Sequence, residues 1–176
     1  MMQTPRSLVL MGPAGCGKST IGRLAADILS LPFLEGDDYH TEANIAVMAA
    51  GGALSDEDRL PWIAAIGRAA GALPAPSCVL ACSALSGRVR AALTDALPAP
   101  PVFALLDVPR AELSRRLAAR QGHFAGPDFL AGQLAALDAA PGAQRLDGTA
   151  PPEAVAQEAA ALFLSAQSSM EDGVSM

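Results

Sequence analysis

Residues 7–20 read SLVLMGPAGCGKST, and this stretch decides the fold. An apolar run, Ser7–Gly12, precedes a glycine-rich segment, and apolar residues then recur at helical spacing from Ile21 to Leu29. An apolar run that does not alternate predicts a strand buried on both faces, and the later spacing predicts a helix. The sequence therefore predicts a strand, a glycine-rich turn and a helix in direct succession.

The glycine-rich segment matches the phosphate-binding pattern G-x-x-x-x-G-K-[ST] at every fixed position. Glycines let successive backbone N–H groups turn toward an anion, and the helix N-terminus adds its dipole. We expect Lys18 to reach the outer phosphates of a nucleoside triphosphate and the Ser19 hydroxyl to coordinate Mg²⁺. The predicted nucleotide-binding residues are Gly12, Pro13, Ala14, Gly15, Cys16, Gly17, Lys18, Ser19 and Thr20.

Strand-like and helical segments alternate along the rest of the 176 residues. Further strands are expected at 32–37, 77–84, 101–108 and 144–147, with helices between them. This alternation predicts an α/β domain with a five-stranded parallel sheet flanked by helices and joined by right-handed crossovers. We expect one domain over residues 1–170 and a frayed tail over 171–176. Such sheets bind ligands beyond the carboxyl ends of their strands.

Composition limits the partners and the compartment. The formal charge is −6 and no basic patch is evident, so a nucleic-acid partner is not expected. No apolar run is long and clean enough to cross a membrane. The three cysteines fit neither a disulfide framework nor a zinc site, which favours reduced thiols and a cytoplasmic location. Cys16 and Cys82 lie near the predicted site and leave a redox switch open, although buried cysteines more often serve as small hydrophobes.

Two carboxylates stand at the end of the second predicted strand. Glu35 and Asp37 are two residues apart, so in a strand both side chains would point at one spot near the phosphate-binding loop. One carboxylate can orient hydrated Mg²⁺, and the other can accept a proton from an attacking hydroxyl. An ordinary acidic turn is the alternative interpretation.

Arginines follow at two further places. Arg59 lies near the start of a helix for which Ser55 is the predicted N-cap, and Arg116 and Arg120 share one face of a later helix. Arginines at such positions can clamp a phosphoryl group in transfer, whereas a solvated basic face is the alternative. The polar, glycine-bearing loop after Arg120 has the composition of a closing lid, expected at about 116–130.

Three blocks of the sequence together resemble the gluconokinases of the thermoresistant type. The blocks are GDDYHTEANIAVMAAGGALSDEDRLPW at 36–62, CSAL at 82–85 and RLAARQGHF at 116–124, and the resemblance extends from Leu8 to Leu137. It implies the P-loop NTPase fold of the nucleoside and shikimate kinases, with a small helical lid. It also implies transfer of the ATP γ-phosphoryl group to the 6-hydroxyl of D-gluconate, with Mg²⁺ as cofactor and a homodimer as the assembly.

The resemblance assigns a role to individual residues. It implies that Asp37 is the catalytic base, that Arg116 and Arg120 bind the ATP phosphates, and that Glu35 helps to hold Mg²⁺ through water. Lys18 and Arg120 would act on the transferred phosphoryl group together with that base. The implied substrate-binding residues are Asp37, His40, Arg59, Ser83, Ala84, His123 and Gln133.

The sequence also departs from the pattern of this family. Thr41, Val47, Ser86 and Val89 stand where proline, lysine, lysine and tyrosine are common, and the segment at 141–147 is shortened. These departures bear on the acceptor and on the adenine side of the site. A kinase of another small sugar acid or of a shikimate-like polyol therefore stays open, as does a non-catalytic sensor of ATP or ligand.

Overall fold

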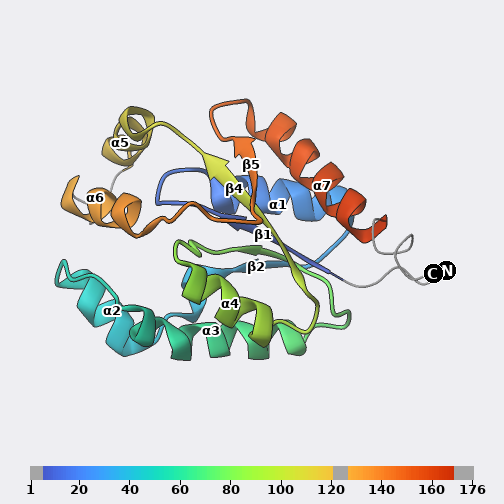
Figure 1. Ribbon diagram of the computed structural model, residues 1–176, viewed down its shortest axis with the longest axis horizontal. Helices are drawn as coiled ribbons and strands as arrows, with labels where there is room; N and C mark the ends of the chain where they lie inside the picture. Colours follow the sequence, from blue (N-terminus) through green and yellow to red (C-terminus); the bar gives the residue numbers. More distant parts are fainter. Residues whose placement is uncertain (1–5, 121–126, 169–176) are drawn as a thin grey trace.

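The computed structural model describes residues 6–120 and 127–168, which form one layered α/β unit (Figure 1). Within these residues, five parallel strands form a sheet in the order β2-β3-β1-β4-β5. The strands are β1 (Ser7–Met11), β2 (Phe33–Glu35), β3 (Val79–Ala81), β4 (Pro101–Asp107) and β5 (Gln144–Asp147). The predicted five-stranded parallel sheet is confirmed.

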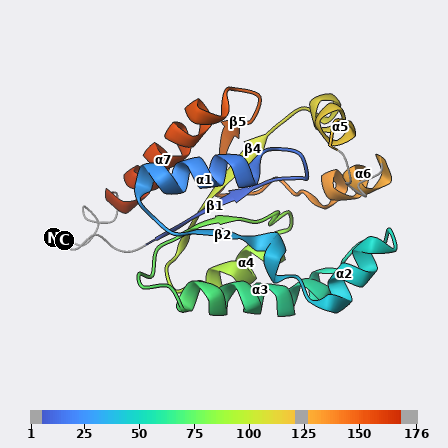
Figure 2. The ribbon, with the colours of Figure 1, turned by 180° about the vertical axis from the view of Figure 1, so that it is seen from behind.

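Helices cover both faces of the sheet. α1 and α7 pack together on one face, and α3 and α4 pack together on the other, as seen from both sides in Figures 1 and 2. α2, α5 and α6 lie at one end of the molecule. The helices are α1 (Lys18–Leu29), the 3₁₀ helix η1 (Gly36–Tyr39), α2 (Glu42–Ala49), α3 (Asp56–Gly71), α4 (Gly87–Ala96), α5 (Arg110–Ala118), α6 (Pro127–Ala136) and α7 (Pro152–Ser168).

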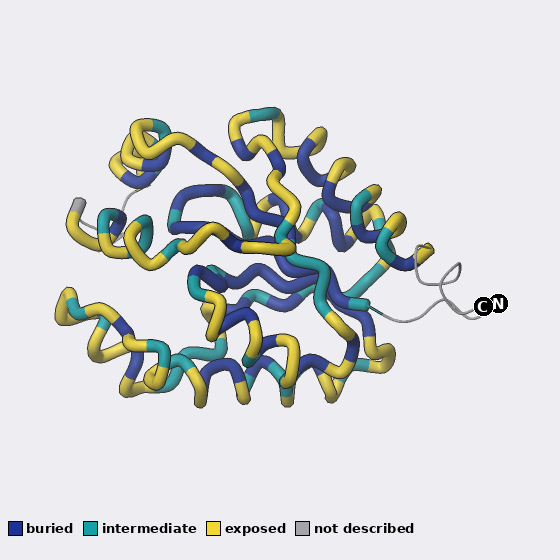
Figure 3. Tube along the Cα trace, viewed as in Figure 1, coloured by how far each residue is buried: buried dark blue, intermediate teal, exposed yellow. Residues whose placement is uncertain are grey.

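The central strand β1 explains why its sequence does not alternate. β1 pairs with β3 on one side and β4 on the other, and all five of its residues are buried. Leu8 and Leu10 join the core under α1 and α7, whereas Val9 and Met11 join the core under α3 and α4. A strand with a core on each face is apolar at successive positions, here Leu8–Met11. The buried serine at its start, Ser7, pairs its hydroxyl with Cys78 Sγ at 3.6 Å. Figure 3 shows the buried sheet between helices that are exposed on their outer sides.

The second strand is shorter than the sequence predicts. Its pairing with β3 stops at Glu35, and the chain then turns into η1, so Asp37 lies in a 3₁₀ turn and not in a strand. The carbonyl of Gly36 accepts a hydrogen bond from Trp62 Nε1 at 2.6 Å, which takes it out of the strand ladder. The inference that strand alternation aligns Glu35 with Asp37 is therefore wrong.

β3 is also shorter than predicted, since it covers Val79–Ala81 and not 77–84, and the chain leaves the extended conformation by Ala84, which has φ 45°. β4 ends within one residue of its predicted end. β5 begins and ends where it was predicted, and Ser55 and Asp58 form a reciprocal capping box at the start of α3. Among the described residues no helix is long and apolar enough to cross a membrane. The predicted tail at 171–176 and residues 121–126 of the predicted lid lie outside the described residues.

Candidate active site

The phosphate-binding loop joins β1 to α1 in a conformation that needs its glycines. Gly17, the N-cap of α1, has φ 103°, in the left-handed region that favours glycine. A Cβ on Gly12 would lie 2.8 Å from Cys16 Sγ, so the buried cysteine fills the space that a side chain would need. Lys18 Nζ lies across the loop and donates to the carbonyls of Gly12 and Pro13, at 3.0 Å each. The Lys18 ammonium group therefore lies against the first two carbonyl groups of the loop.

Strand β3 brings the CSAL segment against this loop. Gly12 N–H donates to Ser83 O at 3.2 Å, and Cys82 N–H donates to Leu10 O at 3.1 Å. Ala84 adopts φ 45°, and its carbonyl accepts from Arg90 Nη1 at 3.0 Å. The carbonyls of Ser83 and Ala84 therefore hold the segment in place, and Ser83 touches the base of the phosphate-binding loop.

A cavity of about 620 Å³ lies beside the phosphate-binding loop, between α5 and the segment after β5. Arg116 and Arg120 both line it. Arg116 Nη2 donates to Gly148 O at 2.9 Å, and its Nε donates to Glu112 Oε1 at 2.7 Å. Hydrogen bonds from Arg115 and Arg116 lower the pKa of Glu112 to about 2, so this carboxylate stays ionised and keeps Arg116 in place. The segment 148–152, which follows the shortened stretch, forms the opposite wall.

Gln133 of α6 contacts the phosphate-binding loop. Its Oε1 accepts from Ala14 N–H at 2.6 Å, although the two residues are 119 positions apart in the sequence. This contact ties α6 to the nucleotide side, whereas the sequence resemblance implies a position over the acceptor. His123, the other residue implied to close over the acceptor, lies outside the described residues.

The turn η1 carries the predicted base. The Asp37 side chain is 75% exposed, whereas the side chain of His40 is only 9% exposed, and His40 Nε2 lies 3.9 Å from Asp37 Oδ1. The imidazole stacks on Trp62 with ring centroids 4.4 Å apart. Burial lowers the pKa of His40 and Arg59 lowers it further, while Asp37 opposes both. His40 is therefore neutral near pH 7 and sits beside an accessible carboxylate.

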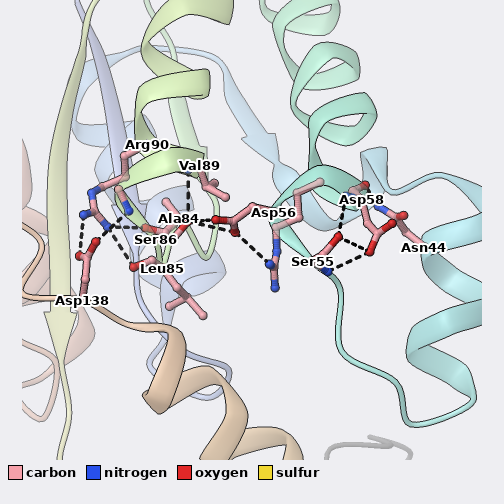
Figure 4. Close-up of polar contacts among 12 residues, drawn as sticks. Asn44, Ser55, Asp56, Asp58, Ala84, Leu85, Ser86, Val89, Arg90 and Asp138 are labelled. Atoms are coloured by element: carbon pink, nitrogen blue, oxygen red, sulfur yellow. Dashed lines mark hydrogen bonds and ion pairs between the residues drawn. The ribbon is translucent and has the colours of Figure 1, made fainter.

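Arg59 is held from its own helix and from α4. Its Nη1 lies 3.4 Å from Asp56 Oδ1, and Ser86 Oγ donates to both oxygens of Asp56 at 3.1 Å. Ser86 also caps α4, since its Oγ accepts from Val89 N–H (Figure 4). A serine at the position where the family often has lysine therefore joins α4 to the carboxylate partner of Arg59.

An ion pair between the buried Arg90 and the partly exposed Asp138 supports the CSAL segment, and sequence reasoning missed it. Arg90 Nη2 donates to Asp138 Oδ1 at 2.6 Å, while its Nη1 donates to the carbonyls of Ala84 and Leu85 (Figure 4). Arg90 is only 6% exposed. Burial alone would raise the pKa of Asp138. The hydrogen bonds from Arg90 and from the N–H groups of Ala140 and Gly87 outweigh it and hold the pKa below its ordinary value. An arginine within a helix beside the CSAL block was the available signal, but its partner is 48 residues away.

The thiol of Cys82 marks where the two halves of the site meet. Burial raises the pKa of Cys82 to about 12; Asp37 contributes in the same direction, while Lys18 and Arg59 act against it. Contacts place three elements at the carboxyl end of β3. Gly12 of the phosphate-binding loop donates to Ser83 O, Gly36 of η1 lies against the Ala81 carbonyl, and Asp56 of α3, the partner of Arg59, binds Ser86. A thiol that stays protonated is poorly reactive, which does not favour the redox switch.

No group of three or more metal-binding side chains gathers within residues 6–120 and 127–168. This agrees with the way Mg²⁺ is usually bound in kinases, through substrate phosphates, water and one or two protein oxygens. The exposed Ser19 at the start of α1 and the half-buried Glu35 at the end of β2 offer oxygens of that kind. The residues present therefore fit a magnesium ion that arrives with a nucleotide.

A phosphate-binding loop, a basic cavity wall and an exposed carboxylate at one edge of the sheet define a P-loop kinase of a small molecule. Residues 14–125 match the shikimate kinase family. The chain is 38% identical over 167 residues to a gluconokinase of Gluconobacter oxydans (strain 621H), which covers 88% of this chain and 89% of the relative. It is also 38% identical over 144 residues to the thermoresistant gluconokinase of Escherichia coli (strain K12), with 79% of each chain covered.

A solved structure agrees with these relatives. The crystal structure of a gluconokinase from Sinorhizobium meliloti 1021 superposes with a TM-score of 0.84 at 32% identity, covering 98% of this chain and 99% of that one. The chain therefore belongs to the gluconokinases, within the shikimate kinase family. Its P-loop kinase fold implies that it uses a nucleotide, as the phosphate-binding loop predicts.

Proposed function

We propose that the protein transfers the γ-phosphoryl group of ATP to the 6-hydroxyl of D-gluconate, giving 6-phospho-D-gluconate. The observation that carries the proposal is the convergence of three elements at the carboxyl end of β3: the phosphate-binding loop with Lys18, η1 with Asp37, and α3 with Arg59. A phosphate-binding cation, an accessible base and an anion-binding cation are what an anionic, hydroxyl-rich acceptor requires. The gluconokinases among the relatives support this choice of acceptor.

Each side chain has a defined task in the reaction. Asp37 accepts the proton of the acceptor hydroxyl as that oxygen bonds to the γ-phosphorus and the bond to ADP breaks. Arg59, held by Asp56, binds the carboxylate of the sugar acid, and His40 contacts one of its hydroxyls. Ser83 and Ala84 line the acceptor pocket beside them. The contact would come from their backbone groups, since a carbonyl that already accepts one hydrogen bond keeps a second lone pair.

The nucleotide side completes the site. The loop from Gly12 to Thr20 cradles the phosphates, with Lys18 on the outer ones and Arg116 and Arg120 at the cavity wall. The Ser19 hydroxyl and, through water, Glu35 would hold Mg²⁺, and the bound ion would supply positive charge to the phosphates.

The surroundings of the enzyme are also part of the proposal. We place it in the cytoplasm as a homodimer, with no nucleic-acid partner. The buried free cysteines Cys16, Cys78 and Cys82 support the location, and the net charge of −6 argues against a nucleic-acid partner. The homodimer rests on the family resemblance alone. Sedimentation at two protein concentrations measures the assembly directly.

An assay of ADP release with Mg-ATP and a set of acceptors tests the proposed reaction. The acceptors are D-gluconate, shikimate, glucose, glycerate and AMP. We expect saturable turnover with D-gluconate and none above background with the others. Turnover with another acid or polyol would replace the acceptor. ATP binding without turnover on any acceptor would identify a sensor.

A further inference from the structure

Trp62 contacts the turn that carries the predicted base, yet neither the sequence patterns nor the proposed reaction gives it a role. It lies on α3, three residues after Arg59, and is only 1% exposed. A buried indole N–H requires an acceptor, and here the acceptor is the Gly36 carbonyl, at 2.6 Å from Nε1. Gly36 is the first residue of η1. The indole therefore fixes the start of this turn.

The other end of the turn rests on the face of the same indole. His40, the C-cap of η1, stacks on Trp62 with an interplanar angle of 13°. Its Nδ1 is buried and has no hydrogen-bond partner among the described residues. The position of the imidazole thus depends on the stack, because no hydrogen bond holds its buried nitrogen.

The opposite side of the turn packs closely against β3. A Cβ on Gly36 would lie 2.5 Å from the carbonyl oxygen of Ala81 in β3. The turn is therefore confined between the end of β3 and the indole. Any displacement of Trp62 changes where Asp37 and His40 lie relative to Ser83 and the phosphate-binding loop.

We propose that Trp62 is a positioning residue, which holds η1 and His40 so that Asp37 and His40 Nε2 face the same acceptor hydroxyl. The 3.9 Å between Nε2 and Oδ1 lets one oxygen lie at about 2.8 Å from both atoms, within hydrogen-bond distance of each. The hydroxyl donates to Asp37 and accepts from the Nε2–H of the neutral imidazole. This inference rests on the proposed function, since it specifies how the same site orients its acceptor.

Substitution of Trp62 separates positioning from a purely structural role. Trp62→Phe keeps an aromatic ring beside His40 and deletes the N–H that binds Gly36. We expect kcat with D-gluconate to fall about 10- to 100-fold, because small misplacements of a reacting group carry losses of that size. The Kd of ATP stays unchanged. Ile66→Val, one turn further along α3 in the same core, is the matched control and lowers stability while retaining kcat.

Fluorescence tests the stack without requiring that this variant folds. Trp62 is the only tryptophan, so all indole emission comes from this site. Protonation of His40, which faces Asp37 and Arg59, quenches the emission as the pH falls, and His40→Phe removes that transition while retaining a stacked ring. We also expect His40→Phe to lower kcat with the Kd of ATP unchanged.

Three results would overturn the inference. A Trp62→Phe enzyme with wild-type kcat is one, and emission whose pH dependence is unaffected by His40→Phe is another. A loss of stability and of affinity for ATP in step with kcat would show a merely structural role. The proposed function is tested separately: it fails if the wild-type enzyme does not phosphorylate D-gluconate.

Discussion

The nucleotide side and the acceptor side of the site are built in different ways. The phosphate-binding loop is nine consecutive residues, Gly12–Thr20, between a strand and the helix that follows it. The acceptor side draws Asp37 from η1, Arg59 from α3 and Ser83 from the segment after β3, and a tryptophan and a buried arginine hold these pieces in place. The phosphate-binding loop depends on consecutive residues that act together. The acceptor side depends on residues of separate elements, so a single substitution can alter one of its contacts and leave the others in place.

The departures from the family fall on both sides of the site. Ser86 lies on the acceptor side, the shortened segment 141–147 precedes a wall of the nucleotide cavity, and the phosphate-binding pattern is intact. Ser86 shows how such a change is accommodated, because it caps α4 and also binds Asp56. Variants that affect one side and leave the other intact are the way to test the division.

Asp37→Asn has the largest expected effect. The amide cannot accept the hydroxyl proton, so we expect kcat to fall about 10²- to 10⁴-fold. The Kd of ATP, measured by calorimetry, should change little because Asp37 lies outside the phosphate-binding loop. Asp38→Asn, at the next exposed carboxylate of the same turn, is the control and should retain activity. Near-wild-type turnover of Asp37→Asn would disprove the assignment of the base.

Arg90→Ala tests the support of the acceptor side. It removes the bonds to Ala84 and Leu85 and leaves Asp138 without its cation, so unfolding should be easier by about 2–4 kcal/mol. Asp138 is 42% exposed on its side chain, which keeps the loss below that of a fully buried pair. Chemical denaturation measures the change.

The matched control for that variant is Arg88→Ala, two residues earlier on α4, which removes an exposed ion pair with Glu57. We expect it to change stability by less than about 1 kcal/mol. Equal losses in the two variants would show that burial of Arg90 does not matter. Among folded molecules, Arg90→Ala should raise the KM of the acceptor and leave that of ATP unchanged.

Gln133→Ala tests whether α6 acts on the binding of ATP or on the binding of the acceptor. The contact with Ala14 N–H predicts that the KM of ATP changes several-fold, because the variant loses a bond worth about 1 kcal/mol to the phosphate-binding loop. Gln133→Glu should raise the KM of ATP, because it places a negative charge beside the phosphates. Gln157→Ala, on the exposed face of α7, is the control. A change confined to the KM of D-gluconate would instead place Gln133 over the acceptor, as the resemblance implies.

Glu112→Gln has the smallest expected effect. Glu112 has a folded-state pKa of about 2 against an ordinary value of 4.5, owing to Arg115 and Arg116. A lowered pKa stabilises the fold fully above pH 4.5, and this contribution is lost as the pH falls toward 2. Thermal unfolding should therefore show a small deficit of the variant at pH 7 that shrinks in acid and in salt. Glu158→Gln on α7 is the control, and a deficit that grows in acid would contradict the assignment.

The sequence predicts best what neighbouring residues determine. The phosphate-binding loop, the capping box at Ser55 and the strand at 144–147 all follow from local patterns. The end of the second strand could not be predicted, because the hydrogen bond that redirects Gly36 comes from Trp62, 26 residues later. The contacts of Gln133 and Arg90 bridge still longer separations, and nothing in the local sequence names their partners.

Identification of the product tests the central claim most directly. Wild-type protein, Mg-ATP and D-gluconate are incubated together, and phosphorus–proton correlation spectra are recorded as ADP accumulates. We predict one phosphate ester, on the oxygen of carbon 6, formed in equal amount to ADP. Release of inorganic phosphate without an ester, or an ester at another hydroxyl, would contradict the proposed reaction.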